Sequence, residues 1–135
     1  MEAHEHTVQP AGSARPDPFG YSHTVTIPPG AALVVVAGQY GSAADGGVIS
    51  PPFDEQVGRA FENVATALRA HGLDLGHVVQ LRSYVVDHDF DKLGVVVAAV
   101  RGIWGDTAPA NTVLGVARLA TPDIAFEVEA IAVSP

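Results

Sequence analysis

The C-terminal segment from Pro109 to Val133 constrains the fold of this chain most, because two long apolar stretches there share one turn. Residues 111–119 and 124–133 are rich in β-branched and small apolar residues, which is typical of strands. The Ala-Thr-Pro-Asp sequence at residues 120–123 supplies residues that favour a turn. We therefore predict two strands, paired with each other as a hairpin.

Alternation along the second of these strands separates two faces, since successive side chains of a strand point in opposite directions. Two carboxylates, Glu127 and Glu129, fall about 7 Å apart on one face. A buried, unpaired charge is costly, so these acids need a wet cleft, a subunit seam or hydrogen-bond donors. They are candidate site residues, and a solvated or interface-structural role is the alternative. The faces are Glu127, Glu129, Ile131 and Val133 against Phe126, Val128, Ala130 and Ala132.

Composition excludes several classes of function. A chain of 135 residues with 47% hydrophobic and 16% charged residues fits one well-cored domain. The net charge of −8 and a single lysine, Lys92, offer no patch for phosphates, so we predict no binding to nucleic acid or membrane. The absence of cysteine excludes disulfides, thiol nucleophiles and thiolate metal sites. No signal peptide is recognisable and the longest apolar run, 93–100, is too short to cross a bilayer, which predicts a cytoplasmic protein.

The order of elements predicts an α+β fold of the pattern β-β-α-β-α-β-β. Residues 1–19 are polar and proline-rich, so we expect a flexible N-terminal arm before one domain at 20–135. The expected elements are strands at 21–27 and 32–37 forming a first hairpin, a helix at 53–71, a strand at 77–86 and a helix at 90–104. Two helices on one face of a mixed sheet leave the other face bare. We expect self-association in a closed cyclic oligomer to bury that face.

No nucleotide-binding, zinc-binding or redox motif occurs, so we predict no cofactor and no metal. The histidines lack ligand spacing on any one element. His23, on a predicted strand beside a tyrosine, is a candidate general base, and a structural strand histidine is the alternative. Lys92 lies at the exposed start of a predicted helix, which does not suit a Schiff base.

Four segments together resemble the YjgF/RidA/UK114 family over residues 20–133. They are Gly20-Tyr21-Ser22, Val36-Ala37-Gly38-Gln39, the FENVATALRAHG run of the first helix, and PANTVLGVARL with FEVEAIAV at the end. The resemblance implies a chorismate-mutase-like α+β subunit, two helices on one face of a mixed sheet, and a homotrimer with ligand clefts between neighbours. The best-known members hydrolyse reactive imines and enamines, such as 2-aminoacrylate, to keto acids and ammonia.

The resemblance also implies site residues, position by position. Tyr21 matches the family's first-strand tyrosine, and Glu127 matches the glutamate that is thought to position the attacking water. These two are the candidate catalytic residues. Asn111 stands where the deaminases place an arginine that pairs with the substrate carboxylate, a geometry that an amide cannot reproduce.

The remaining expected substrate-binding positions also depart from the deaminases. Ala37, before Gly38, replaces a serine; Gly94 replaces an asparagine; and Val113 replaces a cysteine. With Asn111 and His23 these complete the predicted cleft. The pattern resembles the arginine-less branch typified by YjgH, for which the resemblance implies a fold and a cleft but no settled reaction.

Three functions stay open at this point. The first is a trimer whose cleft binds a neutral or cationic small metabolite and adds water to it, as a deaminase-like hydrolase. The second is a non-catalytic small-molecule-binding or partner-docking module. The third is endoribonuclease or translation-inhibitor activity, against which the net charge of −8 argues. If Arg82 or Arg118 enters the cleft and replaces the missing arginine, carboxylate substrates become possible again.

Overall fold

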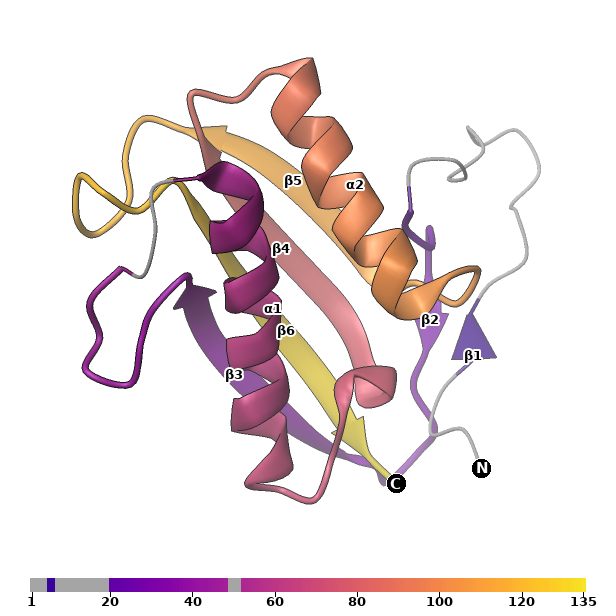
Figure 1. Cartoon of the computed structure of the whole chain (residues 1–135). Coiled ribbons are helices and arrows are strands. Elements are labelled where there is room, and N and C mark those ends of the chain that lie inside the picture. The colour runs from indigo at the N-terminus through magenta and orange to yellow at the C-terminus, as the bar shows by residue number, and fades with distance from the viewer. Residues whose placement is uncertain (1–4, 7–19, 49–51) are drawn as a thin grey trace.

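The protein is described by a computed structural model in which residues 5–6, 20–48 and 52–135 are placed. Within these residues two α-helices cover one face of a four-stranded mixed sheet of order β3-β6-β4-β5 (Figure 1). The sheet consists of β3 (Ala32–Tyr40), β4 (Val78–Val86), β5 (Ala110–Val116) and β6 (Phe126–Ser134). The helices are α1 (Phe53–Arg69) and α2 (Phe90–Trp104). The predicted α+β fold is therefore confirmed.

The helices begin and end where the local sequence favours it. Asp54 and Glu55 in the first turn of α1 suit the positive end of the helix dipole. The Asp89 side chain caps α2 by accepting a hydrogen bond from the Lys92 amide at 2.8 Å. Gly105 follows α2 with a φ of 57°, which lets the chain leave the helix. A short 3₁₀ turn, η1 (Leu75–His77), connects α1 to β4.

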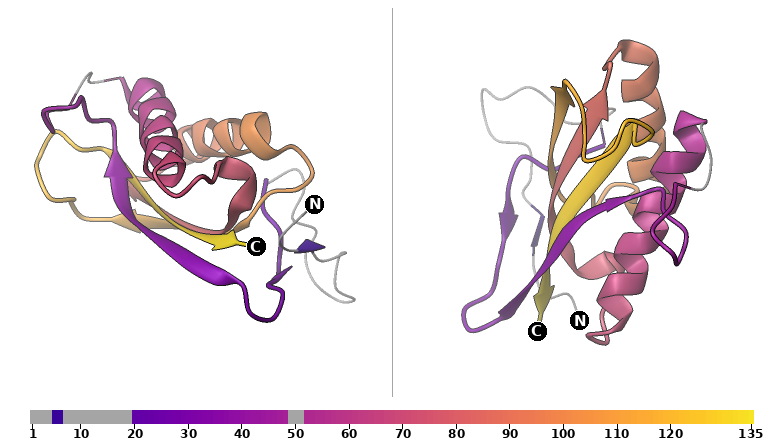
Figure 2. Two further views of the ribbon diagram at one scale, coloured as in Figure 1. Left: turned by 90° about the horizontal axis from the view of Figure 1, so that it is seen from below. Right: turned by 90° about the vertical axis from the view of Figure 1, so that its left-hand side faces the viewer.

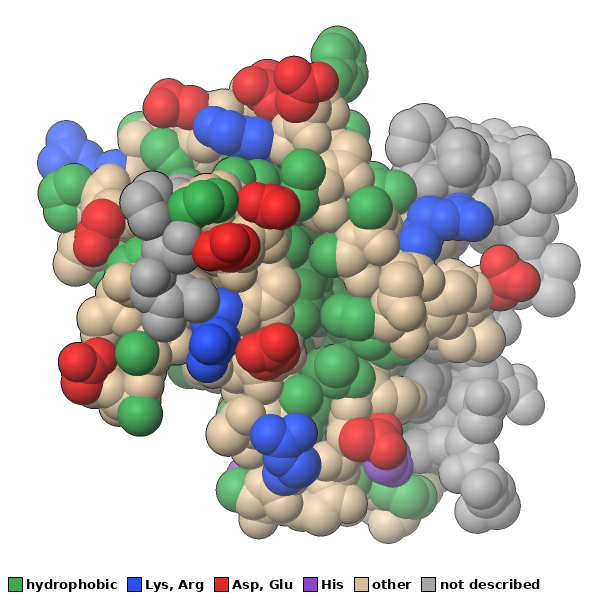
Figure 3. All heavy atoms as spheres, viewed as in Figure 1, with side chains coloured by type: hydrophobic (Ala, Val, Ile, Leu, Met, Phe, Trp, Pro, Cys, Tyr) green, Lys and Arg blue, Asp and Glu red, His purple; other side chains and the backbone are tan. Residues whose placement is uncertain are grey.

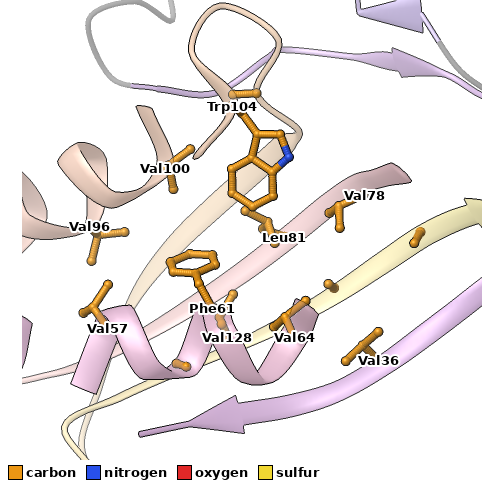
Figure 4. Close-up of a cluster of buried hydrophobic side chains, with 14 of the residues drawn as sticks. Val36, Val57, Phe61, Val64, Val78, Leu81, Val96, Val100, Trp104 and Val128 are labelled. Carbon is orange, nitrogen blue, oxygen red and sulfur yellow. The ribbon is translucent and has the colours of Figure 1, made fainter. Parts of the chain in front are cut away.

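One main hydrophobic core fills the space between the helices and the sheet. Phe61 of α1 and Trp104 of α2 meet edge to face with ring centroids 5.8 Å apart (Figure 4). Val128 of the central strand β6 and Leu81 of β4 are fully buried beneath them. The alternation predicted for β6 is confirmed, since Phe126, Val128, Ala130 and Ala132 are all buried.

The predicted C-terminal hairpin is wrong, because β4 lies between β5 and β6. β5 pairs with β4 in parallel, and β6 pairs antiparallel with both β3 and β4. The turn residues at 120–123 show where one strand ends and the next begins, but they do not determine which strands pair with each other. A central position satisfies both backbone edges of the apolar strand β6, which an edge position would not.

The predicted first hairpin is also wrong. Pro28 and Pro29 form a turn that redirects the chain, and of the strand predicted at 21–27 the structure has Val25–Thr26, β2, in a strand. It pairs with β1 (Glu5–His6) and not with β3. β2 lies on the side of the sheet away from the helices (Figure 2), where Val25 packs against Val79 and Val133. Apart from β1, the predicted N-terminal arm, 1–19, lies outside the described residues.

Candidate functional site

A pocket of about 230 Å³ lies between α2 and the edge strand β5. Its walls are aliphatic, and among the described residues no charged side chain lines it. Two side chains bring polar groups to it, the hydroxyl of Tyr21 and the carboxamide of Asn111. The other lining residues are Leu93, Val96, Val97, Val100 and Val113. The pocket is therefore suited to an apolar group with one or two hydrogen bonds.

Tyr21 is held at this pocket by the backbone beside it. Ser22 extends the sheet next to β5, since its amide donates to Pro109 O at 3.0 Å and its hydroxyl donates to Ala108 O at 2.6 Å. Gly20 packs closely under α2, where a Cβ would lie 3.1 Å from Cγ of Arg101. His23 contacts Tyr21 edge to face at 5.3 Å between ring centroids, but it does not line the pocket.

Asn111 is positioned from below by a buried serine. Ser83 of β4 is 0% exposed, and its hydroxyl donates to Oδ1 of Asn111 at 3.3 Å. Asn111 pairs in register with Leu81, a core residue under the helices. The carboxamide consequently lies on the helix-covered face of the sheet.

The two acids of β6 lie on the other face of the sheet, which we call the open face. Glu127 pairs in register with Tyr84, and Glu129 pairs with Arg82. The Tyr84 hydroxyl donates a hydrogen bond to Glu129, which raises the pKa of that tyrosine. Burial, and then the charge of Glu129, raise the pKa of the Glu127 carboxyl. Glu129 thus has a hydrogen-bond partner in Tyr84, and the environment of Glu127 favours its protonated form.

Gly38 makes room for Glu127. A Cβ built at residue 38 would lie 2.8 Å from both Cδ and Oε2 of Glu127. Real Cβ atoms do not approach other atoms so closely, so a larger residue would displace the carboxylate. Ala37, the neighbouring predicted residue, is exposed.

The structure therefore divides the predicted site residues into two groups on opposite faces of one sheet. Tyr21, Asn111 and Val113 line the pocket, while Glu127 and Gly38 meet on the open face. Gly94 belongs to neither group: it is exposed on α2, and a Cβ built at that residue would meet no other atom within 4 Å.

No arginine takes the place of Asn111 in the pocket of the described chain. Arg82 is exposed on β4 beside Glu129, on the open face. Arg118 lines a different hollow, beside the connection between β5 and β6. The pocket keeps its uncharged lining.

Sequence reasoning missed Ser83 and the α2 residues that form the pocket wall. A signal for Ser83 was present, because it is a lone polar residue in the apolar alternation Val79, Leu81, Ser83, Val85. The wall carried no such signal, since Val96, Val97 and Val100 are indistinguishable by sequence from ordinary core residues.

Among the residues placed in the structure, no cluster of three or more His, Cys, Asp or Glu could hold a metal ion. Over the same residues, neither α-helix combines the length and apolarity needed to span a membrane.

Comparison with known proteins places these features in a family. Residues 13–134 match the family model described as endoribonuclease L-PSP. A conserved Rid family protein of unknown function, YyfB from Yersinia pestis, has a similar structure, with a TM-score of 0.88 and 29% identity over 96% of this chain and 98% of its own. Protein YjgH has a TM-score of 0.69 and 29% identity over 85% and 84%.

E. coli TdcF with bound serine is similar as well, with a TM-score of 0.66 and 25% identity over 96% of this chain and 92% of its own. The match of the family model covers most of the sequence, and the structural matches cover most of both chains. The chain therefore belongs to the endoribonuclease L-PSP family, the YjgF/RidA/UK114 family of Rid proteins.

Proposed function

We propose that this chain forms a homotrimer whose clefts bind a small metabolite and add water to it. The observation that carries the proposal is the division of the site residues between two faces of one sheet. Asn111 lies under α2, while Glu127 lies on the open face, and the sheet separates them. A site that uses both residues needs the pocket of one copy and the open face of a neighbour.

The open face has the surface that such an assembly needs. Val35 and Leu33 of β3 are 72% and 54% exposed, and both pair in register with open-face residues of β6. Leu114 of β5 pairs with Tyr84 and is 38% exposed. Exposed apolar side chains gathered on one face favour burial against another copy.

The proposed reaction is hydrolysis of an imine or of an enamine in its imine form. The water oxygen bonds to the imine carbon, the carbon–nitrogen bond breaks, and the products are a carbonyl compound and ammonia. Both protons of the water end on the leaving nitrogen: Glu127 accepts one as the water adds and passes it to the nitrogen, and the hydroxyl of the adduct gives up the second as the carbon–nitrogen bond breaks. A raised pKa makes a carboxylate a stronger base for this exchange. Serine in the related TdcF supports a site for small molecules in this family.

Complementation between two inactive variants tests the shared cleft. Asn111→Leu damages the pocket and Glu127→Gln damages the open face, so each homotrimer should release little ammonia from imines made by an amine or amino-acid oxidase. In randomly mixed 1:1 trimers about a quarter of the clefts combine an intact pocket with an intact open face. Mixed refolding should restore about that fraction of wild-type activity. No restoration would mean that each site lies within one chain.

A non-catalytic binding module is the second candidate. It is favoured by Asn111, which stands where the deaminases have an arginine that holds the substrate carboxylate. In that case the wild type and Glu127→Gln would release ammonia at the same rate, while both would bind the same small molecules.

Endoribonuclease activity, which the family description names, fits this chain less well. On the helix-covered face, Lys and Arg side chains stand singly among acidic and neutral ones (Figure 3). The net charge of −8 repels the phosphate backbone. Cleavage of RNA that falls steeply with salt and is lost in a pocket variant would favour this activity instead.

A further inference from the structure

The pocket under α2 presents a hydrogen-bond donor of fixed direction, and this follows from the hydroxyl of Ser83. That hydroxyl is completely buried, and a buried hydroxyl without a partner is costly. Within the described part of the chain its hydrogen-bond partner is Oδ1 of Asn111. Its proton must therefore point to that oxygen, because the opposite arrangement of the amide would leave the buried donor without an acceptor.

The orientation of Asn111 decides what the pocket offers. With Oδ1 engaged by Ser83, the amide presents its Nδ2 group, a donor, for which no partner occurs among the described residues. Tyr21 lines the same pocket, and its hydroxyl can donate as well. Both polar side chains of the lining can thus offer a donor to a ligand.

The rest of the pocket selects against charge. Its walls are five aliphatic side chains, and no charged group of the described chain lines it. A carboxylate bound there would lose its water without gaining a counter-ion, and Glu127 of the neighbouring copy, which the proposed trimer brings to the cleft, would repel it. An ammonium ion would offer no acceptor to the donors of Asn111 and Tyr21. A branched aliphatic group, in contrast, gains from leaving water for a cavity of about 230 Å³.

We infer that this pocket takes an uncharged, branched aliphatic compound with a carbonyl oxygen or imine nitrogen, which Asn111 Nδ2 holds and Ser83 orients. The inference rests on the proposed function for the use of this pocket, and it names the ligand class. Ser83 is a positioning residue, since it acts through Asn111 and does not touch the ligand.

Three compounds with the same branched body test the ligand class. Isobutyramide is neutral with an acceptor oxygen, isobutyrate is an anion, and isobutylamine is a cation without an acceptor. In ¹H–¹⁵N correlation spectra of the full chain, isobutyramide should shift the side-chain NH₂ signals of Asn111 saturably. The two ions should bind at least about tenfold more weakly. Equal or tighter binding of isobutyrate would overturn the inference.

Ser83→Ala tests the positioning role. It should weaken isobutyramide binding about threefold to tenfold and reduce the shift that the Asn111 side-chain signals reach at saturation. Ser42→Ala, a matched control at the far end of β3, removes a hydroxyl that Asn63 contacts at 3.0 Å and should leave binding unchanged. Unchanged Asn111 shifts in a folded Ser83→Ala protein would contradict the role of Ser83.

Binding is measured apart from hydrolysis, so the two proposals can fail separately. Isobutyramide binding without ammonia release would leave this inference standing and remove the catalytic proposal. The imine made from valine carries a carboxylate, and the imine made from isobutylamine does not. If the protein hydrolyses only the imine from valine, this inference is removed and the catalytic proposal is kept.

Discussion

Gly38 lies so close to Glu127 that one methyl group at residue 38 would come within 2.8 Å of the carboxylate. The backbone of Gly38 does not have a positive φ, so space and not conformation requires glycine here. This contact links β3, which carries Gly38, to the acid of β6.

Gly38→Ala should reduce ammonia release strongly with little loss of stability. The added methyl group meets the end of a flexible side chain, which can move aside, but the carboxylate then leaves its place. Ammonia release and the melting temperature should be measured together. Gly58→Ala on α1, where a Cβ meets nothing within 4 Å, is the matched control and should keep full activity. A Gly38→Ala protein of wild-type activity would remove Glu127 from the mechanism.

Glu127→Gln should stabilise the protein at neutral pH but not at acidic pH. Burial and Glu129 raise the pKa of Glu127 above its ordinary value of 4.5, so the folded state binds the proton more tightly than the unfolded state does. The protonated carboxyl therefore contributes its full stabilisation of the folded state below pH 4.5. This contribution is lost as the pH rises through the raised pKa. Glutamine resembles the protonated acid at every pH.

The measurement is the difference in melting temperature between Glu127→Gln and the wild type. It should be near zero at about pH 4 and positive at about pH 7. A difference that is the same at both pH values would show that the carboxyl is not perturbed.

Tyr84→Phe should lower the free energy of unfolding by about 1 kcal/mol, because it removes the hydrogen bond to Glu129. The pairing is best measured by urea unfolding in a double-mutant cycle with Glu129→Gln, at one fixed protein concentration. Effects of the two changes that simply add would mean that the residues do not interact.

Val35→Glu should dissociate the oligomer. The side chain is 72% exposed on the open face, where the neighbouring copy is proposed to pack, and a buried carboxylate there would be unpaired. Light scattering after gel filtration should give the mass of one chain for Val35→Glu and the mass of three chains for the wild type. Ile103→Glu, a half-exposed apolar position on α2, should remain trimeric. A trimeric Val35→Glu protein would place the interface elsewhere.

Asn111→Arg should reverse the charge preference of the pocket. A guanidinium pairs with a carboxylate through two charge-assisted hydrogen bonds, so isobutyrate should gain at least about tenfold in affinity relative to isobutyramide. Asn111→Leu is the control, because it removes the donor and adds no charge, and it should bind neither compound well. Both variants lack the Asn111 carboxamide, so the titration follows backbone amide signals of the pocket lining instead, such as that of Val113.

Much of the fold could be predicted from the sequence, because helices depend on contacts between near neighbours. The apolar spacing of 53–71 and 90–104 predicted α1 and α2 to within two residues. The alternation at 126–133 correctly separated the buried side of β6 from the side that carries Glu127. Tyr21, Asn111 and Val113 came from family resemblance and do meet at one pocket.

Strand pairing and the division of the site were decided only by the tertiary structure. Hydrogen bonds between strands join residues far apart in the chain, and the local signal at 120–123 could not place β4 between β5 and β6. The same long-range packing put Ser83 beneath Asn111, and it put Asn111 and Glu127 on opposite faces of the sheet. The sequence by itself determined which residues are candidates for the site. The sheet decided that these candidates face opposite ways, since register fixes the face of every side chain on a strand.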